Sequence, residues 1–261
     1  MSIPTPPDPM STLSLSMNSS AHTSQESPAM PPLPDLNAEI IALFVGRVEE
    51  RWPGKPSSAI GKKPTHDALH LEETGFTEDS QADLKVHGGP EKAVHHYAAD
   101  HMAHWRTTFP DNADSFVPGC FGENVSTTGL NEQNLCLGDT LKMGSATVQI
   151  CQGRQPCWKL NAHTGISQMA AAFQRTAFTG WYYRVLQQGT VRAGDVICLI
   201  ERPCPDLSLD RLIRARFDPV LSPDFAAELA GQPHLSQSWR AAFAKKQARG
   251  FKENTDARLM G

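Results

Sequence analysis

Short runs of β-branched and aromatic residues, separated by glycine-containing turns, constrain the fold of this chain more than any other feature. Such runs are typical of β-strands bounded by turns. They lie at 40–52, 134–144, 146–153, 180–186 and 195–203. Between them, apolar residues at helical spacing predict helices over Ala98–Phe109 and Ser167–Arg175. The region 38–204 is therefore expected to be mainly β with some α, folded as a barrel or a curled sheet.

The pattern becomes helical after residue 204. Ser208, Ser222 and Ser236 each stand before an amphipathic segment, where a serine is a suitable N-cap, and Gly231 is a suitable stop for the second segment. Three short helices of this kind are able to bury one shared face. We therefore predict a small C-terminal three-helix region at 205–261, following the β-rich domain.

Residues 1–37 differ in composition from the rest of the chain. They are rich in Pro, Ser, Thr and Met and show neither a helical nor a strand period. A segment with few large apolar groups cannot bury enough surface to offset the entropy lost on ordering. We predict a disordered tail there. Met10, Met17 and Met30 are alternative start positions, so whether the tail is translated is left open.

Composition excludes several classes of protein. The chain has 261 residues and a net charge of −4, which provides no overall attraction to nucleic acid or to an anionic membrane. No apolar run approaches the ~20 residues of a membrane span. The six cysteines form no Cys-x-x-Cys pair, and no Lys or Arg precedes Arg47, so neither a disulfide framework nor a secretory signal is predicted. We expect a cytoplasmic protein with reduced thiols.

One cysteine has unusual neighbours. Cys157 follows Pro156 and lies between Arg154 and Lys159 in the stretch GRQPCWKLN. Proline stiffens the backbone before the thiol, and nearby cations favour the thiolate, which is a nucleophile and a soft metal ligand. The alternative is a buried structural cysteine. The flanking charges make Cys157 the first candidate for chemistry.

Two further stretches carry polar groups in patterns that suit a ligand. In LKVHGGPEKAVHHY, His87 precedes the tight turn Gly88–Gly89, and Lys85 and Lys92 add positive charge. In CFGENVSTTGLNE, Glu123 and Asn124 follow a glycine and are suited to hydrogen bonding with an amide-like ring edge. Ordinary turns and polar loops are the alternative for both. Five histidines at 87–104 also suggest a zinc site, but no pair has a recognised ligand spacing with a third partner.

Taken in order and spacing, KVHGGPEKAVHHY, FGENVSTTGLNE, LGDTL and QPCWKLNAH resemble the MOSC domain family. The similarity is greatest to its YiiM-like branch, which carries a three-helix C-terminal extension, and it covers residues 38–250. The resemblance implies a β-barrel-like domain that binds the molybdenum cofactor (Mo-molybdopterin), with Cys157 as molybdenum ligand. At the level of the family it also implies pyridoxal phosphate binding. The candidate cofactor contacts are Lys85, Gly88, Gly89, Lys92, Glu123, Asn124, Arg154, Lys159 and Asn161.

The resemblance further implies an oxidoreductase that reduces N-hydroxylated compounds, such as hydroxylamino purines, to amines. His87 is the candidate proton donor, because a histidine titrates near neutral pH. The chain has no dinucleotide-binding Gly-x-Gly-x-x-Gly motif and no Cys-x-x-Cys motif. A separate electron donor, a flavin or iron–sulfur reductase, is therefore expected, and a homodimer is left open.

Two other functions stay open on the sequence. Cys157 is also suited to carry a persulfide in a metal-free sulfur transferase. A non-enzymatic binding module that uses the helical extension to hold a partner is the third reading. Metal content separates the first two functions, and wild-type behaviour after Cys157→Ala would favour the third.

Overall fold

The computed structural model describes residues 1–3, 32–83, 88–248, 251 and 253–260. Residues Leu33–Gly261 form one compact unit, of which Met1–Pro32 are not part. The predicted disordered tail therefore lies mostly outside the described residues. Lys85 and His87, two of the predicted site residues, also lie outside them.

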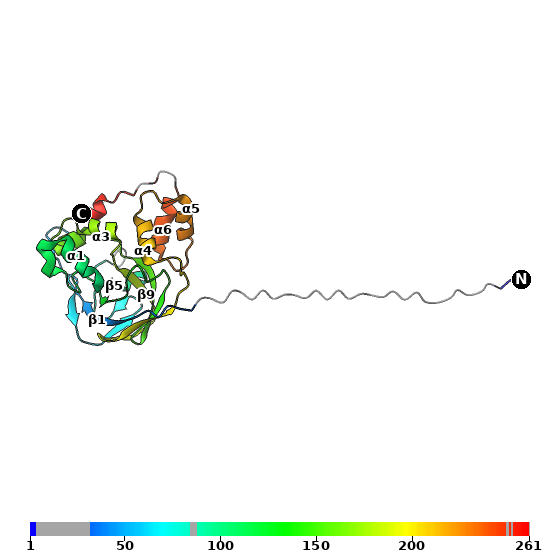
Figure 1. Ribbon diagram of the computed structural model, residues 1–261, viewed down its shortest axis with the longest axis horizontal. Helices are drawn as coiled ribbons and strands as arrows, with labels where there is room; N and C mark the ends of the chain where they lie inside the picture. The colour runs from blue at the N-terminus through cyan, green and yellow to red at the C-terminus, as the bar shows by residue number, and fades with distance from the viewer. Residues whose placement is uncertain (4–31, 84–87, 249–250, 252, 261) are drawn as a thin grey trace. The chain divides into compact units, whose positions relative to one another are not determined.

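The centre of the fold is a closed barrel of seven strands (Figure 1). These strands are β1 (Asn37–Val45), β5 (Val94–Ala98), β6 (Val125–Thr127), β7 (Thr140–Met143), β8 (Ala146–Gly153), β9 (Trp181–Gln187) and β11 (Val196–Glu201). They follow one another around the barrel in the order β11–β7–β8–β9–β5–β6–β1, and the ring closes where β1 pairs with β11. β5 and β6 run parallel, and the other neighbours in the ring run antiparallel. Closure pairs each of the seven ring strands on both sides, so the ring itself has no open edge.

Short strands extend the barrel at its rim. β2 (Lys63–Thr65) pairs with β1. β3 (Leu69–Glu72), β4 (Gly75–Phe76) and β10 (Gly189–Val191) form a separate three-stranded sheet. Each of the five predicted strand runs overlaps a barrel strand, and β8 covers the predicted run 146–153 in full. The prediction of a β-barrel with added helices is confirmed.

Helices cover the barrel. They are the 3-10 turns η1 (Pro90–Lys92), η2 (Ala99–His101) and η3 (Pro110–Ser115) and the α-helices α1 (Met102–Thr108), α2 (Trp158–Thr164), α3 (Met169–Thr176), α4 (Leu209–Phe217), α5 (Pro223–Ala230), α6 (Gln237–Lys246) and α7 (Asp256–Met260). The three predicted N-caps are confirmed: Ser208, Ser222 and Ser236 each accept a hydrogen bond from the backbone N–H three residues on. The sequence did not predict α2 or α7.

The C-terminal helices α4 to α6 pack directly on the barrel. Leu212, Ile213, Trp239 and Phe243 belong to the same hydrophobic cluster as the inward residues of the strands. Gly153 at the end of β8 allows this contact, because a Cβ there would lie 2.4 Å from Ile213 and 3.1 Å from Trp239. Burial of this shared apolar face stabilises both parts. Division of the chain into 38–204 and 205–261 stays a prediction.

A second cluster forms an aromatic layer between α1, α3 and β5. Trp105 stacks on Phe173 at 5.1 Å, and Phe173 stacks on Tyr97 at 5.6 Å. The indole N–H of Trp105 donates to the hydroxyl of Tyr97 at 2.6 Å, so this buried polar group has its partner. The layer holds the predicted helices, which the structure places as η2 with α1 and as α3, against the barrel.

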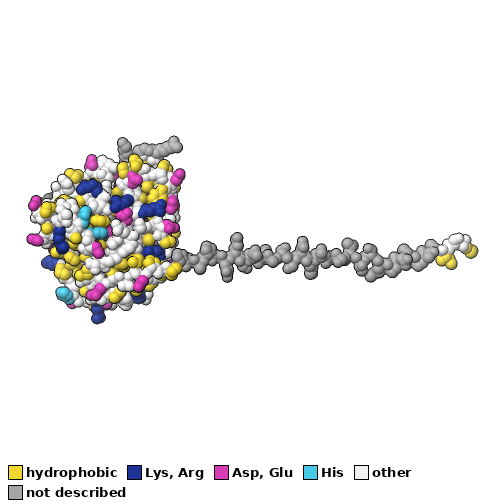
Figure 2. All heavy atoms as spheres, viewed as in Figure 1, with side chains coloured by type: hydrophobic (Ala, Val, Ile, Leu, Met, Phe, Trp, Pro, Cys, Tyr) yellow, Lys and Arg dark blue, Asp and Glu magenta, His cyan; other side chains and the backbone are white. Residues whose placement is uncertain are grey.

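The surface carries charges of both signs. Basic and acidic side chains are interspersed on the face shown in Figure 2, in keeping with a net charge of −4. Among the described residues, no helix combines the length and the apolar content needed to span a bilayer.

Candidate functional site

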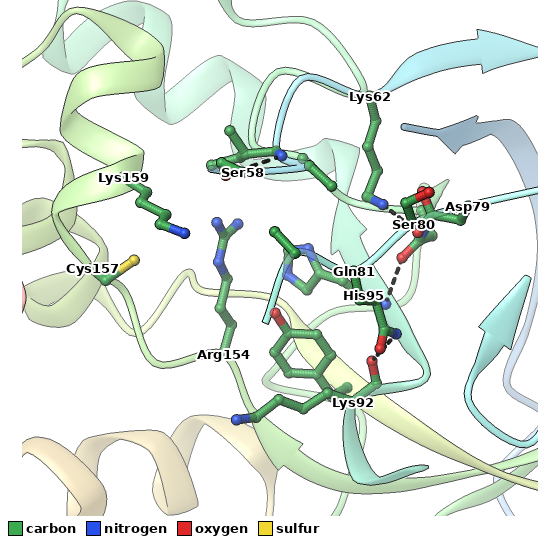
Figure 3. Close-up of a pocket in the computed structure, with 16 residues that line it drawn as sticks. Ser58, Lys62, Asp79, Ser80, Gln81, Lys92, His95, Arg154, Cys157 and Lys159 are labelled. Atoms are coloured by element: carbon green, nitrogen blue, oxygen red, sulfur yellow. Dashed lines mark hydrogen bonds and ion pairs between the residues drawn. The ribbon is translucent and has the colours of Figure 1, made fainter. Parts of the chain in front are cut away.

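A pocket lies where the end of β8, the start of α2, the loop before β2 and the loop after β4 meet (Figure 3). It contains about 610 Å³ of empty space, part of it open to solvent. Its lining consists of Ser58, Ala59, Ile60, Lys62, Asp79, Ser80, Gln81, Ala82, Lys92, His95, Gly122, Asn124, Arg154, Cys157, Lys159 and Tyr182. Among the described residues, one thiol, four cationic side chains and one carboxylate thus line this cavity. We call it the Cys157 pocket.

Cys157 owes its position to a change of structure in the chain. β8 ends at Gly153, and α2 begins at Trp158, with Cys157 as its N-cap residue in an extended conformation (φ −140°, ψ 170°). The carbonyl of Cys157 accepts the first helical bond from the N–H of Leu160 at 2.9 Å. In Figure 3 the sulfur points into the pocket on the side of Lys159 and Arg154. The thiol is therefore held at a well-defined strand-to-helix junction.

Two buried cations lie beside the thiol. Arg154 is 8% exposed and donates to the carbonyl of Phe121 at 2.6 Å. Lys159 is 7% exposed and donates to the carbonyl of Ser57 at 3.0 Å. A carbonyl oxygen carries only a partial negative charge, so these bonds fix the cations in place without neutralising them. Inside a protein such charges are attractive partners for phosphate or carboxylate.

On the opposite wall, Lys62 forms an ion pair with Asp79 (Figure 3). The other Asp79 oxygen accepts from the backbone N–H of Gly46 at 2.7 Å, and Asn124 donates its amide N–H to Asp79 at 2.8 Å. Burial lowers the pKa of Lys62, and the adjacent Asp79 opposes that shift. The network is nearly closed to water, and its hydrogen bonds hold both charges in place.

Comparison with known proteins identifies the family of this chain. A family model described as "MOSC domain" matches residues 83–198. Protein YiiM of Escherichia coli (strain K12) is 37% identical over 221 residues, which is 85% of this chain and 98% of that protein. This chain belongs to the MOSC domain family. Within it, the chain is YiiM-like.

Two further relatives and one crystal structure are similar to this MOSC protein. The uncharacterized protein YflK of Bacillus subtilis (strain 168) is 35% identical over 80% of this chain and 95% of its own length. A protein named "Reductase" from Gibberella moniliformis is 36% identical over 68% of this chain, but this match covers only 32% of that longer protein. The crystal structure of YiiM from Escherichia coli superposes with a TM-score of 0.72 at 31% identity, over 85% of this chain and 99% of that one.

The pocket brings together about half of the predicted site residues of the MOSC domain. Lys92, Asn124, Arg154, Cys157 and Lys159 line it. The remaining described residues of the prediction lie outside the lining, and they are Gly88, Gly89, Glu123 and Asn161.

The Gly88–Gly89 turn approaches a side chain. The N–H of Gly89 donates to Gln81 Oε1 at 2.9 Å. A Cβ on Gly88 would lie 2.2 Å from that same oxygen, and Gly89 has a φ of +89° that favours glycine. Gln81 in turn lines the pocket, so the two glycines position a pocket residue in this structure.

Glu123 and Asn161 form hydrogen bonds with backbone groups of the protein. Glu123 is fully buried and accepts from the N–H groups of Gly119 and Phe121. Burial raises the pKa of Glu123, although these N–H groups and Arg154 oppose the shift. Asn161 accepts from the N–H of Ala170 at 2.7 Å and donates to the carbonyl of Leu259 at 2.8 Å, which joins α2 to α3 and α7.

Sequence reasoning missed His95 as a member of the pocket. On β5 the side chains of His95 and His96 point to opposite faces. His95 lines the pocket, whereas His96 contacts the hydroxyls of Tyr183 at 3.0 Å and Thr127 at 2.9 Å in the core. Burial, and then the charge of Arg154, hold the pKa of His95 well below its usual value. Its imidazole is therefore neutral. Separately, the described residues contain no cluster of three or more His, Cys, Asp or Glu that could bind a metal ion.

Stability of the protein should fall as the pH is lowered from 7.5 to 5.5. Burial lowers the pKa of His95 and brings that of His96 to about 3, so below pH 6.5 these residues take up protons only in the unfolded chain. Each then contributes a loss of about 1.4 kcal/mol across this interval, or roughly 3 kcal/mol together. Denaturant unfolding at both pH values measures this loss.

The raised pKa of Glu123 opposes that trend, since a carboxyl protonated in the fold gains stability in acid. A His96→Gln variant isolates one histidine's contribution, because it should lose about 1.4 kcal/mol of the pH dependence whatever its stability at pH 7.5. An unchanged dependence in this variant would contradict the assignment.

Proposed function

We propose that this MOSC protein is a molybdenum cofactor-dependent oxidoreductase that reduces N-hydroxylated compounds to amines, with Cys157 as molybdenum ligand. Membership of the MOSC family and the relative named "Reductase" support the general class. The observation that carries the proposal is the Cys157 thiol in a pocket beside two buried cations.

The residues of the pocket fit this cofactor. A cysteine thiolate is a soft donor of the type that suits a sulfur-ligated metal. Arg154 and Lys159 are held by carbonyl groups, so they are placed to bind the anionic phosphate of the pterin. Gln81 and Asn124 line the wall, but their amide N–H groups already donate within the protein. Each amide oxygen accepts one backbone N–H and has capacity for a second hydrogen bond from the polar edge of a pterin ring.

When bound, the cofactor supplies a two-electron reduction: R–NHOH, two electrons and two protons give R–NH2 and water. The protein has to position the substrate, exclude bulk water and deliver protons. Neutral His95 donates from Nε2 to the carbonyl of Thr179 at 3.4 Å. Its Nδ1 therefore carries no hydrogen and is able to accept a hydrogen bond from a ligand. His87 stays the predicted proton donor, outside the described residues.

Two electrons per turnover have to come from outside this chain. We expect a flavin or iron–sulfur reductase as a separate partner, because the sequence lacks the motifs that bind a dinucleotide or an iron–sulfur cluster. The small-molecule substrate is an N-hydroxylated compound, of which a hydroxylamino purine is the test case.

The experiment begins with protein purified from a host that makes the molybdenum cofactor. Elemental analysis should find molybdenum, and oxidised pterin fluorescence should rise with it in constant ratio. With a reduced viologen as artificial donor, the protein should reduce hydroxylaminopurine, whereas NADH alone should support no turnover. Metal-free protein that carries a persulfide on Cys157 would instead establish the sulfur transferase. Robust turnover with NADH alone would overturn the separate donor.

A further inference from the structure

The end of the chain packs against the turn that carries Cys157. The helix α7, drawn in red in Figure 1, lies next to α3. Arg258 in α7 donates from Nη1 to the carbonyl of Pro156 at 2.5 Å and from Nη2 to Oε1 of Gln174 at 2.8 Å. One planar guanidinium thus joins the residue before Cys157 to helix α3, across 102 positions of sequence.

Other contacts bring the same segment to this place. Glu253 receives two hydrogen bonds from Arg216 of α4, at 2.5 and 3.0 Å. Asn161 of α2 donates to the carbonyl of Leu259 at 2.8 Å. A helix of five residues is not stable by itself, so α7 depends on these partners. Residues 253–260 are therefore attached to α2, α3 and α4 through polar side chains.

Arg258 is partly buried and carries its charge close to the thiol. Its guanidinium lies 5.6 Å from the ring of Phe217, and its Nε is buried without a hydrogen-bond partner among the described residues. Burial lowers the pKa of Arg258, while Glu253 and then Cys157 oppose the shift through their charges. Keeping a cation at such a place is costly unless its hydrogen bonds are good, and Arg258 makes two of them to groups on different elements.

The proline in the turn before Cys157 offers one backbone group for a hydrogen bond. Pro156 has no N–H, so its carbonyl is the only backbone group through which that residue can be held. Rotation about this peptide would redirect the Cys157 side chain, because Cys157 follows directly. A lysine has one ammonium and lacks the fixed fork of an arginine, so it would not hold Pro156 and Gln174 in one geometry.

We infer that Arg258 is a positioning residue for Cys157. It fixes the Pro156 carbonyl against α3 and thereby sets the direction in which the sulfur enters the pocket. The inference rests on the proposed function only in that Cys157 is taken as the metal ligand. The local effect on the turn concerns the chain itself and does not require the cofactor.

Hydrogen–deuterium exchange on cofactor-free full-length protein tests the local effect. In Arg258→Ala, amides in a peptide over 155–164 should exchange about tenfold faster, while those of the barrel strands keep their wild-type rates. Arg258→Lys should restore part of the protection, since it can reach one of the two acceptors. Arg175→Ala is the matched control, because Arg175 is an exposed arginine of α3 next to Gln174.

A second measurement connects the turn to the site. When produced with the cofactor, Arg258→Ala should hold several-fold less molybdenum than the Arg175→Ala control. Equal exchange over 155–164 in Arg258→Ala and Arg175→Ala would overturn the inference, as would faster exchange throughout the barrel. If Arg258→Ala does not fold, Gln174→Ala removes one anchor and should raise exchange in the same peptide; wild-type exchange there would also overturn the inference. If Arg258→Ala changes exchange over 155–164 but the wild-type protein binds no molybdenum, only the proposed function is refuted.

Discussion

Cys157→Ser is expected to abolish reduction of N-hydroxylated substrates. A serine hydroxyl is a hard and weakly acidic donor, so it cannot replace the metal–sulfur bond that we propose for the thiolate. The substitution removes little volume at a half-exposed position, and Arg154 and Lys159 stay in place, so the fold and some pterin binding should persist. Turnover with a reduced viologen, together with molybdenum and pterin content, measures the effect.

The matched control makes the same Cys→Ser substitution at a position outside the pocket. Cys198 lies in β11 and is also partly exposed, but it does not line the pocket. Cys198→Ser should therefore retain wild-type turnover and metal content, with at most a small loss of stability. If Cys157→Ser were to remain active, Cys157 would not be the metal ligand.

Asp79→Ala should be among the most destabilising single changes in the pocket. The side chain of Asp79 is 6% exposed and accepts hydrogen bonds from Lys62, Asn124 and the backbone of Gly46. Its loss leaves the buried Lys62 ammonium without its counter-ion and two donors without acceptors. Breaking a buried pair from one side costs about 3–5 kcal/mol, and denaturant unfolding measures this free energy.

The double variant Lys62→Met/Asp79→Leu separates the lost pair from the stranded charge. Removing both charges leaves no uncompensated ion, so the double variant should be clearly more stable than Asp79→Ala. It should nevertheless bind less cofactor, because the pocket wall has lost a cation. Equal stability of the two variants would show that the ammonium of Lys62 is not the source of the cost.

Part of the fold follows from local signals. Each N-cap serine needs only the backbone N–H three residues later, so Ser208, Ser222 and Ser236 could be recognised one by one. The strand β8 has alternating apolar residues between two turns, and its limits were predicted in full. The strand β5 was missed, because the two histidines in VHHYA hide a segment that is buried on both faces.

The candidate site likewise contains residues that local sequence predicts and residues that it does not. Cys157, Arg154 and Lys159 lie within six positions of each other, and one strand-to-helix turn brings all three to the pocket. Lys62 and Asp79 come from loops, and neither has a sequence pattern that marks the other as its partner. Asn161 falls in a family motif but bonds to Leu259 near the end of the chain.

The sequence by itself determined a mainly β domain with capped C-terminal helices and a thiol flanked by cations, since these depend on short-range periodicity, caps and covalent neighbours. Only the tertiary structure decided that the barrel closes between β1 and β11, that His95 faces the pocket and that Arg258 reaches Pro156. Contacts of this kind join residues far apart in the chain, and their partners are selected by the packing of the whole core. No local pattern contains that information.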